Sequence, residues 1–170
     1  AFPYSHGFET LDCWTNSSTT TPWALDAGNY YGPNSVTEGT SALYFNDHDF
    51  ETGSTSDVLS PFINTAALAA PRLSFDYWDG DGADTVKVVV FNGTTTEVVY
   101  ETAAAVNAWT PIQIDLSQYA GQTIKIGFRG TSVKGATNPH IDNVVVDERP
   151  CLAPSELTIT TVTQTTATLS

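Results

Sequence analysis

The sequence has few basic residues, only two cysteines and no methionine. Its 170 residues include 6 Lys and Arg against 19 Asp and Glu, so the formal net charge is −13. The basic residues are scattered along the chain, and a chain of this charge repels phosphate groups. Nucleic acids and anionic membrane surfaces are therefore excluded as partners, whereas cations are favoured.

Long hydrophobic runs are also missing. No apolar stretch approaches the roughly 18 residues that span a bilayer, so we expect no membrane insertion. The opening AFPYSHGFE has neither the basic nor the apolar region of a signal peptide, and the absence of an initiator Met indicates a processed or excised chain. An aromatic content of 11% with only 15% charged residues excludes a disordered acidic tail.

The two cysteines, Cys13 and Cys151, lie near the ends of the main region of the chain. Low Lys content, high Thr content and this placement are typical of an extracellular β protein joined by one disulfide. Two unpaired thiols fit the same sequence. We predict a secreted or cell-surface protein.

Helical periodicity is nearly absent, and short runs rich in Val, Ile, Thr, Tyr and Phe recur between turn-forming residues. The Asn-Gly dipeptide at Asn92 predicts a tight hairpin. A helical turn is expected after Leu116, and 65–70 is a second helical candidate. The predicted strands are 41–45, 73–78, 85–91, 97–101, 110–116, 123–129 and 141–147. This pattern predicts an all-β sandwich of two antiparallel sheets.

The composition changes after Arg149. Pro150, Cys151 and Pro154 form a stiff connector, and 155–170 alternates apolar residues with Thr. This segment resembles the first strands of a fibronectin type III module, although a Thr-rich linker or an edge strand fits it too. We predict one domain over 1–151, followed by a linker and the first strands of a truncated module over 152–170.

Catalytic motifs are not visible. The sequence has no GxSxG, and its three histidines lie apart without zinc-site spacing. We expect no enzyme activity in this chain, although the parent protein is expected to be a secreted hydrolase or protease. Calcium binding explains the many carboxylates better than catalysis does, because Ca²⁺ binds six to eight oxygens. The stretch 79–84, DGDGAD, imitates the start of an EF-hand loop, but it lacks the Glu at position twelve and the flanking helices.

A second set of motifs is spread over the chain. An early Phe-Glu pair at Glu9, a Trp, a G-x-x-x-L at Gly39, Leu-Ser-Pro at 59–61 and Ile-Asp-Asn-Val around Asp142 occur in that order. Together they resemble the MAM domain and its bacterial secreted relatives over 2–151. The animal form has four cysteines, so its pairing does not transfer, and Cys13–Cys151 is the internal option left.

The MAM resemblance implies a jelly-roll β-sandwich whose first and last strands are tied together by a structural Ca²⁺. Glu9 and Asp142 are then the main side-chain ligands. The full expected ligand set is Glu9, Asp47, Asp142, Gly39, Ser41, Asn46 and Asp49. Solvated loop carboxylates and turn formers are the alternative explanation for these residues.

Aromatic side chains provide the other functional signal. Trp78 ends a strand beside the acidic stretch that contains Asp79 and Asp81, and Tyr30 and Tyr31 lie in a long irregular segment. We predict that these five residues contact a ligand. The favoured function is a non-catalytic, calcium-stabilised adhesion or accessory module of a larger secreted bacterial protein. It would bind protein or polysaccharide outside the cell, beside other domains of the same chain. The alternative is a carbohydrate-binding module that targets an attached enzyme to polysaccharide.

Overall fold

The computed structural model describes residues 2–17, 23–102, 105–150, 159–162 and 167–169. Its strands are β1 (Tyr4–His6), β2 (Thr15–Asn16), β3 (Trp23–Asp26), β4 (Ala42–Phe45), β5 (Thr55–Leu59), β6 (Ile63–Asn64), β7 (Pro71–Asp79), β8 (Thr85–Phe91), β9 (Thr96–Glu101), β10 (Val106–Asp115), β11 (Thr123–Thr131), β12 (His140–Glu148), β13 (Ile159–Val162) and β14 (Ala167–Leu169). One 3₁₀ turn, η1 (Ser117–Tyr119), follows Leu116.

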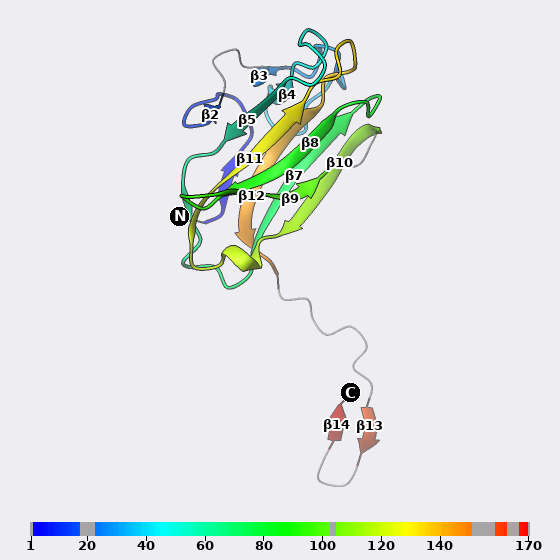
Figure 1. The fold of residues 1–170 in the computed structure, drawn as a ribbon. Coiled ribbons are helices and arrows are strands. Elements are labelled where there is room, and N and C mark those ends of the chain that lie inside the picture. The colour runs from blue at the N-terminus through cyan, green and yellow to red at the C-terminus, as the bar shows by residue number, and fades with distance from the viewer. Residues whose placement is uncertain (1, 18–22, 103–104, 151–158, 163–166, 170) are drawn as a thin grey trace.

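Two six-stranded antiparallel sheets form the sandwich (Figure 1). The first has the order β10-β7-β12-β4-β3, with β1 paired to β12, and the second has the order β2-β5-β11-β8-β9, with β6 paired to β11. This confirms the predicted fold class, an all-β jelly-roll sandwich. Because β1 and β12 are neighbours, the first and last strands of the main domain lie side by side.

The predicted strands all occur, with bounds that differ by at most four residues from those expected, and the hairpin of β8 and β9 forms as expected. The helical candidate at 65–70 is wrong, because the segment forms turns. The backbone amides of Ala69 and Ala70 bind the Glu148 carboxylate rather than helical carbonyls. Pro71 then disfavours a helical conformation at the residue before it.

Alternation along each strand places one apolar row between the sheets. Leu73, Phe75 and Tyr77 of β7 face the core, and Ile124, Ile126 and Phe128 of β11 face it from the other sheet. Trp14 and Trp23, at 6% and 1% exposure, close the core near the β2 and β3 edge. The outward-facing residues of both sheets are therefore left to carry the surface chemistry.

The register of the first sheet decides which loops meet. Tyr44 of β4 lies opposite His140 of β12, and His140 lies opposite Trp78 of β7. The end of β4, the end of β7 and the start of β12 therefore lie at one end of the sandwich, drawn uppermost in Figure 1. We call this the loop end.

The described residues test only part of the predictions about the two ends of the chain. Strands β13 and β14 pair with each other, and the two-module division stays a prediction. Cys13 is exposed and free, while Cys151 lies outside the described residues, so the proposed disulfide is not supported. None of the described residues forms a helix that is long and apolar enough to cross a membrane.

Candidate functional site

The turn between β7 and β8, at the loop end, brings three aspartates together. Asp79 ends β7, and Asp81 and Asp84 lie in the short turn before β8. One carboxylate oxygen from each of the three lies within 4.8 Å of those of the others, in the one such acidic group found among the described residues. Asp79 and Asp84 are buried and Asp81 is exposed. These three carboxylates form a group that could hold a metal ion such as Ca²⁺.

The carboxylates of Asp79 and Asp81 have hydrogen-bond donors around them. Asp79 accepts hydrogen bonds from the Gly82 amide at 3.1 Å and the Tyr77 hydroxyl at 3.3 Å. Asp81 accepts from the amides of Ala83 at 3.1 Å and Thr137 at 2.9 Å. Burial raises the pKa of Asp79 because its charged form loses water.

Asp84 has no such donors. The residue is 5% exposed, and no amide, hydroxyl or basic side chain among the described residues donates to either of its buried carboxylate oxygens. Burial, followed by the nearby carboxylate of Asp47, raises the pKa of Asp84 far above that of an ordinary carboxyl. A buried carboxylate without partners is costly, so Asp84 marks the point where the cluster is incomplete.

Asp47 joins this cluster from the loop after β4. It is fully buried, and its Oδ1 accepts a hydrogen bond from the Val133 amide while its Oδ2 has no partner. Its backbone amide donates to Asn138 Oδ1 at 2.8 Å. Asp47 therefore faces Asp84 while being tied to the loop between β11 and β12.

The carboxylates of Glu9 and Asp142 anchor a different segment, residues 37–41. Asp142 is fully buried, and its Oδ2 accepts from the amides of Thr37 at 2.8 Å and Glu38 at 2.9 Å. Glu9 accepts from the amides of Thr40 at 2.7 Å and Ser41 at 3.0 Å. Hydrogen bonds from the Thr40 hydroxyl and these amides lower the pKa of Glu9. Both carboxylates are thus supplied with donors.

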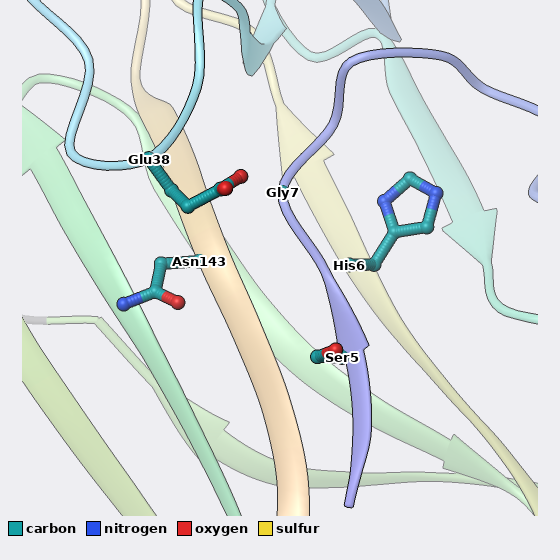
Figure 2. A pocket seen from close by; sticks show the side chains of 5 residues that line it. All are labelled: Ser5, His6, Gly7, Glu38 and Asn143. Carbon is teal, nitrogen blue, oxygen red and sulfur yellow. The ribbon is translucent and has the colours of Figure 1, made fainter.

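A polar pocket of about 280 Å³ lies beside this anchor (Figure 2). Its lining residues are Ser5, His6, Gly7, Glu38 and Asn143. In Figure 2 the Glu38 carboxylate reaches across toward Gly7, which directly follows β1, the strand that carries Ser5 and His6. Asn143 has a positive φ of 52° within the bulge that interrupts the pairing of β12 with β7.

The seven residues expected to share one ion lie at two places. Gly39 and Ser41 belong to the segment 37–41 before β4, and the carboxylates of Glu9 and Asp142 contact that segment. Asn46, Asp47 and Asp49 follow β4 at its other end, where Asp49 accepts hydrogen bonds from Asn46 at 3.1 Å and from the Tyr30 hydroxyl at 2.6 Å. The calcium ligation predicted for these residues stays a prediction.

The loop between β3 and β4, residues 27–41, covers the outer face of the first sheet. We call it the tyrosine loop. Asp26 binds the amides of Gly28 and Tyr30, each at 2.7 Å. Asn138 donates to the Tyr30 carbonyl at 2.8 Å, and Trp109 donates to the Ser35 hydroxyl at 3.1 Å. Glu9 and Asp142 hold its last residues, so the loop is fixed along its whole length.

Tyr30 and Tyr31 are the exposed part of this loop, at 37% and 49% exposure. The Tyr31 ring stacks on His48, with centroids 3.6 Å apart and planes 14° from parallel. Tyr30 packs edge-on against Tyr31. The hydroxyl of Tyr30 binds Asp49, and this contact raises the pKa of Tyr30 to about 12. The pair is therefore held in place while exposed to solvent.

Trp78 is less available to a ligand than the two tyrosines. It is half-buried and packs edge-on against His140, which Trp109 and Tyr44 also contact. Gly32 of the tyrosine loop lies over this imidazole, and a Cβ there would collide with it. His140 is fully buried beneath the loop, so these rings form a packed cluster rather than an exposed aromatic row.

Comparison with solved structures finds the same fold in binding modules. The chain is similar to a carbohydrate-binding module, TmCBM61, in complex with β-1,4-galactotriose, with a TM-score of 0.64 and 16% identity over 84% of this chain and 94% of that one. It is similar to the K1 cleaved adhesin domain of Lys-gingipain from Porphyromonas gingivalis W83, with a TM-score of 0.66 and 15% identity over 88% and 100%. A third similar structure is the C-terminal family 22 carbohydrate-binding module of Clostridium thermocellum Xyn10B, with a TM-score of 0.59 and 12% identity over 88% and 96%.

Sequence comparison does not assign the chain to a family. No protein-family model and no curated protein matches the chain. The resemblances to MAM and fibronectin type III modules therefore stay predictions. At these identities the structural neighbours establish the sandwich fold, which adhesin domains and carbohydrate-binding modules share.

Sequence analysis missed the roles of Asp84 and Asn138. The D-x-D-x-x-D spacing of 79–84 is the sequence signal for Asp84, but its departure from the EF-hand pattern argues against a metal-binding role for this stretch. Asn138 had no sequence signal, since its role is to join the loop of Asp47 to the tyrosine loop. The five residues predicted to contact a ligand all lie at the loop end, which leaves that prediction open to test.

Proposed function

We propose that this chain is a non-catalytic adhesion or accessory module of a larger secreted protein, and that it binds its partner through the tyrosine loop. The observation that carries this proposal is the exposed pair Tyr30 and Tyr31 on a loop fixed along its length. Two rigid aromatic side chains offer large contact area at low entropic cost. The partner is a protein or polysaccharide outside the cell.

The carbohydrate-binding alternative is favoured by one further feature. The Tyr31 ring is stacked on His48 and is 49% exposed, so it offers aromatic surface on which a sugar ring could stack. Asp49 and Asn46 lie close to Tyr30 and add polar groups beside this platform. The structural neighbours include a module bound to β-1,4-galactotriose, which makes galactan a suitable first probe.

A structural Ca²⁺ is the third part of the proposal. A bound cation would stabilise the folded state by mass action and would be held permanently at extracellular calcium concentrations. Its role would be to hold the loops that present the tyrosines. It would take no part in chemistry.

A binding comparison of three proteins tests this function. The wild type, Tyr31→Ala and Phe62→Ala are applied to a glycan array that includes β-1,4-galactan and to a panel of immobilised secreted proteins. Phe62 is the matched control, because it is 55% exposed and directly precedes β6 of the other sheet. We expect binding that Tyr31→Ala reduces at least about tenfold and Phe62→Ala leaves unchanged.

Each outcome of this comparison decides something. Binding to glycans alone selects the carbohydrate-binding alternative, and binding to proteins alone selects adhesion. Binding that survives Tyr31→Ala, or that Phe62→Ala abolishes, would overturn the assignment to the tyrosine loop. The same conclusion follows if the wild type binds nothing on either panel.

A further inference from the structure

The cluster at the loop end has a feature that acidic surface groups lack: buried oxygens with nothing to bind. Asp84 contributes two such oxygens at 5% exposure, and the fully buried Asp47 contributes one. Buried carboxylate oxygens are normally hydrogen-bonded, and leaving them unpartnered is costly. These three oxygens, on two neighbouring side chains, are groups that a bound cation would satisfy.

No described side chain supplies that charge. None of the four aspartates forms an ion pair with Lys, Arg or His among the described residues. Lys134 lies on the neighbouring loop, but it pairs with Glu51 at 2.5 Å. The donors that do reach the cluster are backbone amides and hydroxyls, and they serve Asp79, Asp81 and one oxygen of Asp47.

From this arrangement we propose a calcium site formed by Asp47, Asp79, Asp81 and Asp84. The donor set contains oxygen alone, which selects a hard cation over zinc or copper. Calcium binds oxygen at about 2.4 Å, so two ligands on opposite sides of one ion lie about 4.8 Å apart. The oxygens of Asp79, Asp81 and Asp84 lie within 4.8 Å of one another, a spread that one such ion spans.

The ion would join three loops that are distant in the sequence. Asp47 follows β4, the other three aspartates lie between β7 and β8, and Val133 and Thr137 bind the cluster from the loop before β12. Asn138 connects the amide of Asp47 to the carbonyl of Tyr30, so the site lies directly behind the tyrosine loop. The proposal deepens the calcium component of the proposed function and rests on it for the structural role of the ion.

Thermal melts of four proteins in chelator and in excess calcium test the site. At calcium concentrations near 100 times the dissociation constant, the wild type should melt about 5–10 °C higher than in chelator. Asp84→Asn keeps the side-chain shape and removes the charge, so it should lose this response. Asp142→Asn, in the other carboxylate group, and Asp12→Asn, an exposed control, should keep it.

A second variant covers the case in which Asp84→Asn does not fold. Asp81 is exposed, so Asp81→Asn is expected to fold and to bind calcium at least about tenfold more weakly in a calorimetric titration. An unchanged wild-type melt in calcium would overturn the site. Loss of the response in Asp142→Asn with retention in Asp84→Asn would overturn it and move the ion to the anchor of the tyrosine loop. Partner binding through Tyr31 is measured separately, so either proposal can fail alone.

Discussion

Two groups of carboxylates lie beyond opposite ends of β4, and they differ in what their oxygens bind. Glu9 and Asp142 face backbone amides of the segment 37–41, and those donors hold the negative charge in place. Asp47 and Asp84 face each other and have three buried oxygens without partners. The first group has donors from the chain itself, whereas the second has the oxygens that the proposed cation would bind. The number of donors around a carboxylate, rather than the number of carboxylates, indicates where a cation is needed.

The largest expected effect is that substitutions in the two groups change the free energy of unfolding in opposite directions in calcium-free buffer. Asp142→Ala should destabilise the protein by about 3 kcal/mol, because it removes a fully buried carboxylate that accepts hydrogen bonds from the amides of Thr37 and Glu38. Asp84→Asn should stabilise it by roughly 1–3 kcal/mol, because burial and the Asp47 carboxylate raise the pKa of Asp84, so the wild type takes up a proton when it folds at neutral pH and the amide does not. Urea unfolding in chelator measures both changes.

The contrast has a clear way to fail. If both variants lower stability by similar amounts in chelator, Asp84 has donors that make it equivalent to Asp142, and the distinction between the groups is lost. Asp12→Asn serves as the exposed control and should change stability by less than about 0.5 kcal/mol.

Much of the fold was predictable from the sequence because strands follow a local rule. In β8 and β11 polar Lys87 and Lys125 alternate with apolar neighbours, so each strand has one inner face. The hairpin at Asn92 is equally local. The strands β1, β2, β3, β5 and β6 were not predicted, since pairing with neighbouring strands, rather than their own composition, makes them strands.

The candidate site depended on register, which the sequence does not reveal. Asp47 meets Asp84 because β4, β12 and β7 align Tyr44, His140 and Trp78 in one row, so the loops beyond that row converge. The sequence motifs around Glu9 and Asp142 correctly indicated neighbouring strands, because β1 pairs with β12. They did not indicate that backbone amides supply donors to both carboxylates.

Asp26 provides an intermediate case and the smallest effect. Burial alone would raise its pKa, but the hydrogen bond and charge of His140 and the amides of Tyr30 and Gly28 outweigh burial, so its pKa is lowered. A lowered folded-state pKa contributes stability above the unfolded pKa, near 4, and that stability is lost as pH falls through the folded value.

Asp26→Asn should therefore cost about 1 kcal/mol at neutral pH, and this difference from the wild type should shrink as pH falls below about 4. Urea unfolding of both proteins between pH 3 and pH 7 measures it. A difference that stays constant over this range would mean that the charge of Asp26 does not stabilise the tyrosine loop.

The most direct test of the calcium site is terbium luminescence excited through tryptophan. Trp78 lies beside the cluster, since a Cβ on Gly80 would be 2.8 Å from its ring. The account predicts emission from one Tb³⁺ per chain that Ca²⁺ displaces, that Asp84→Asn abolishes and that Asp142→Asn preserves. Emission that persists in Asp84→Asn, or that disappears in Asp142→Asn, would contradict it.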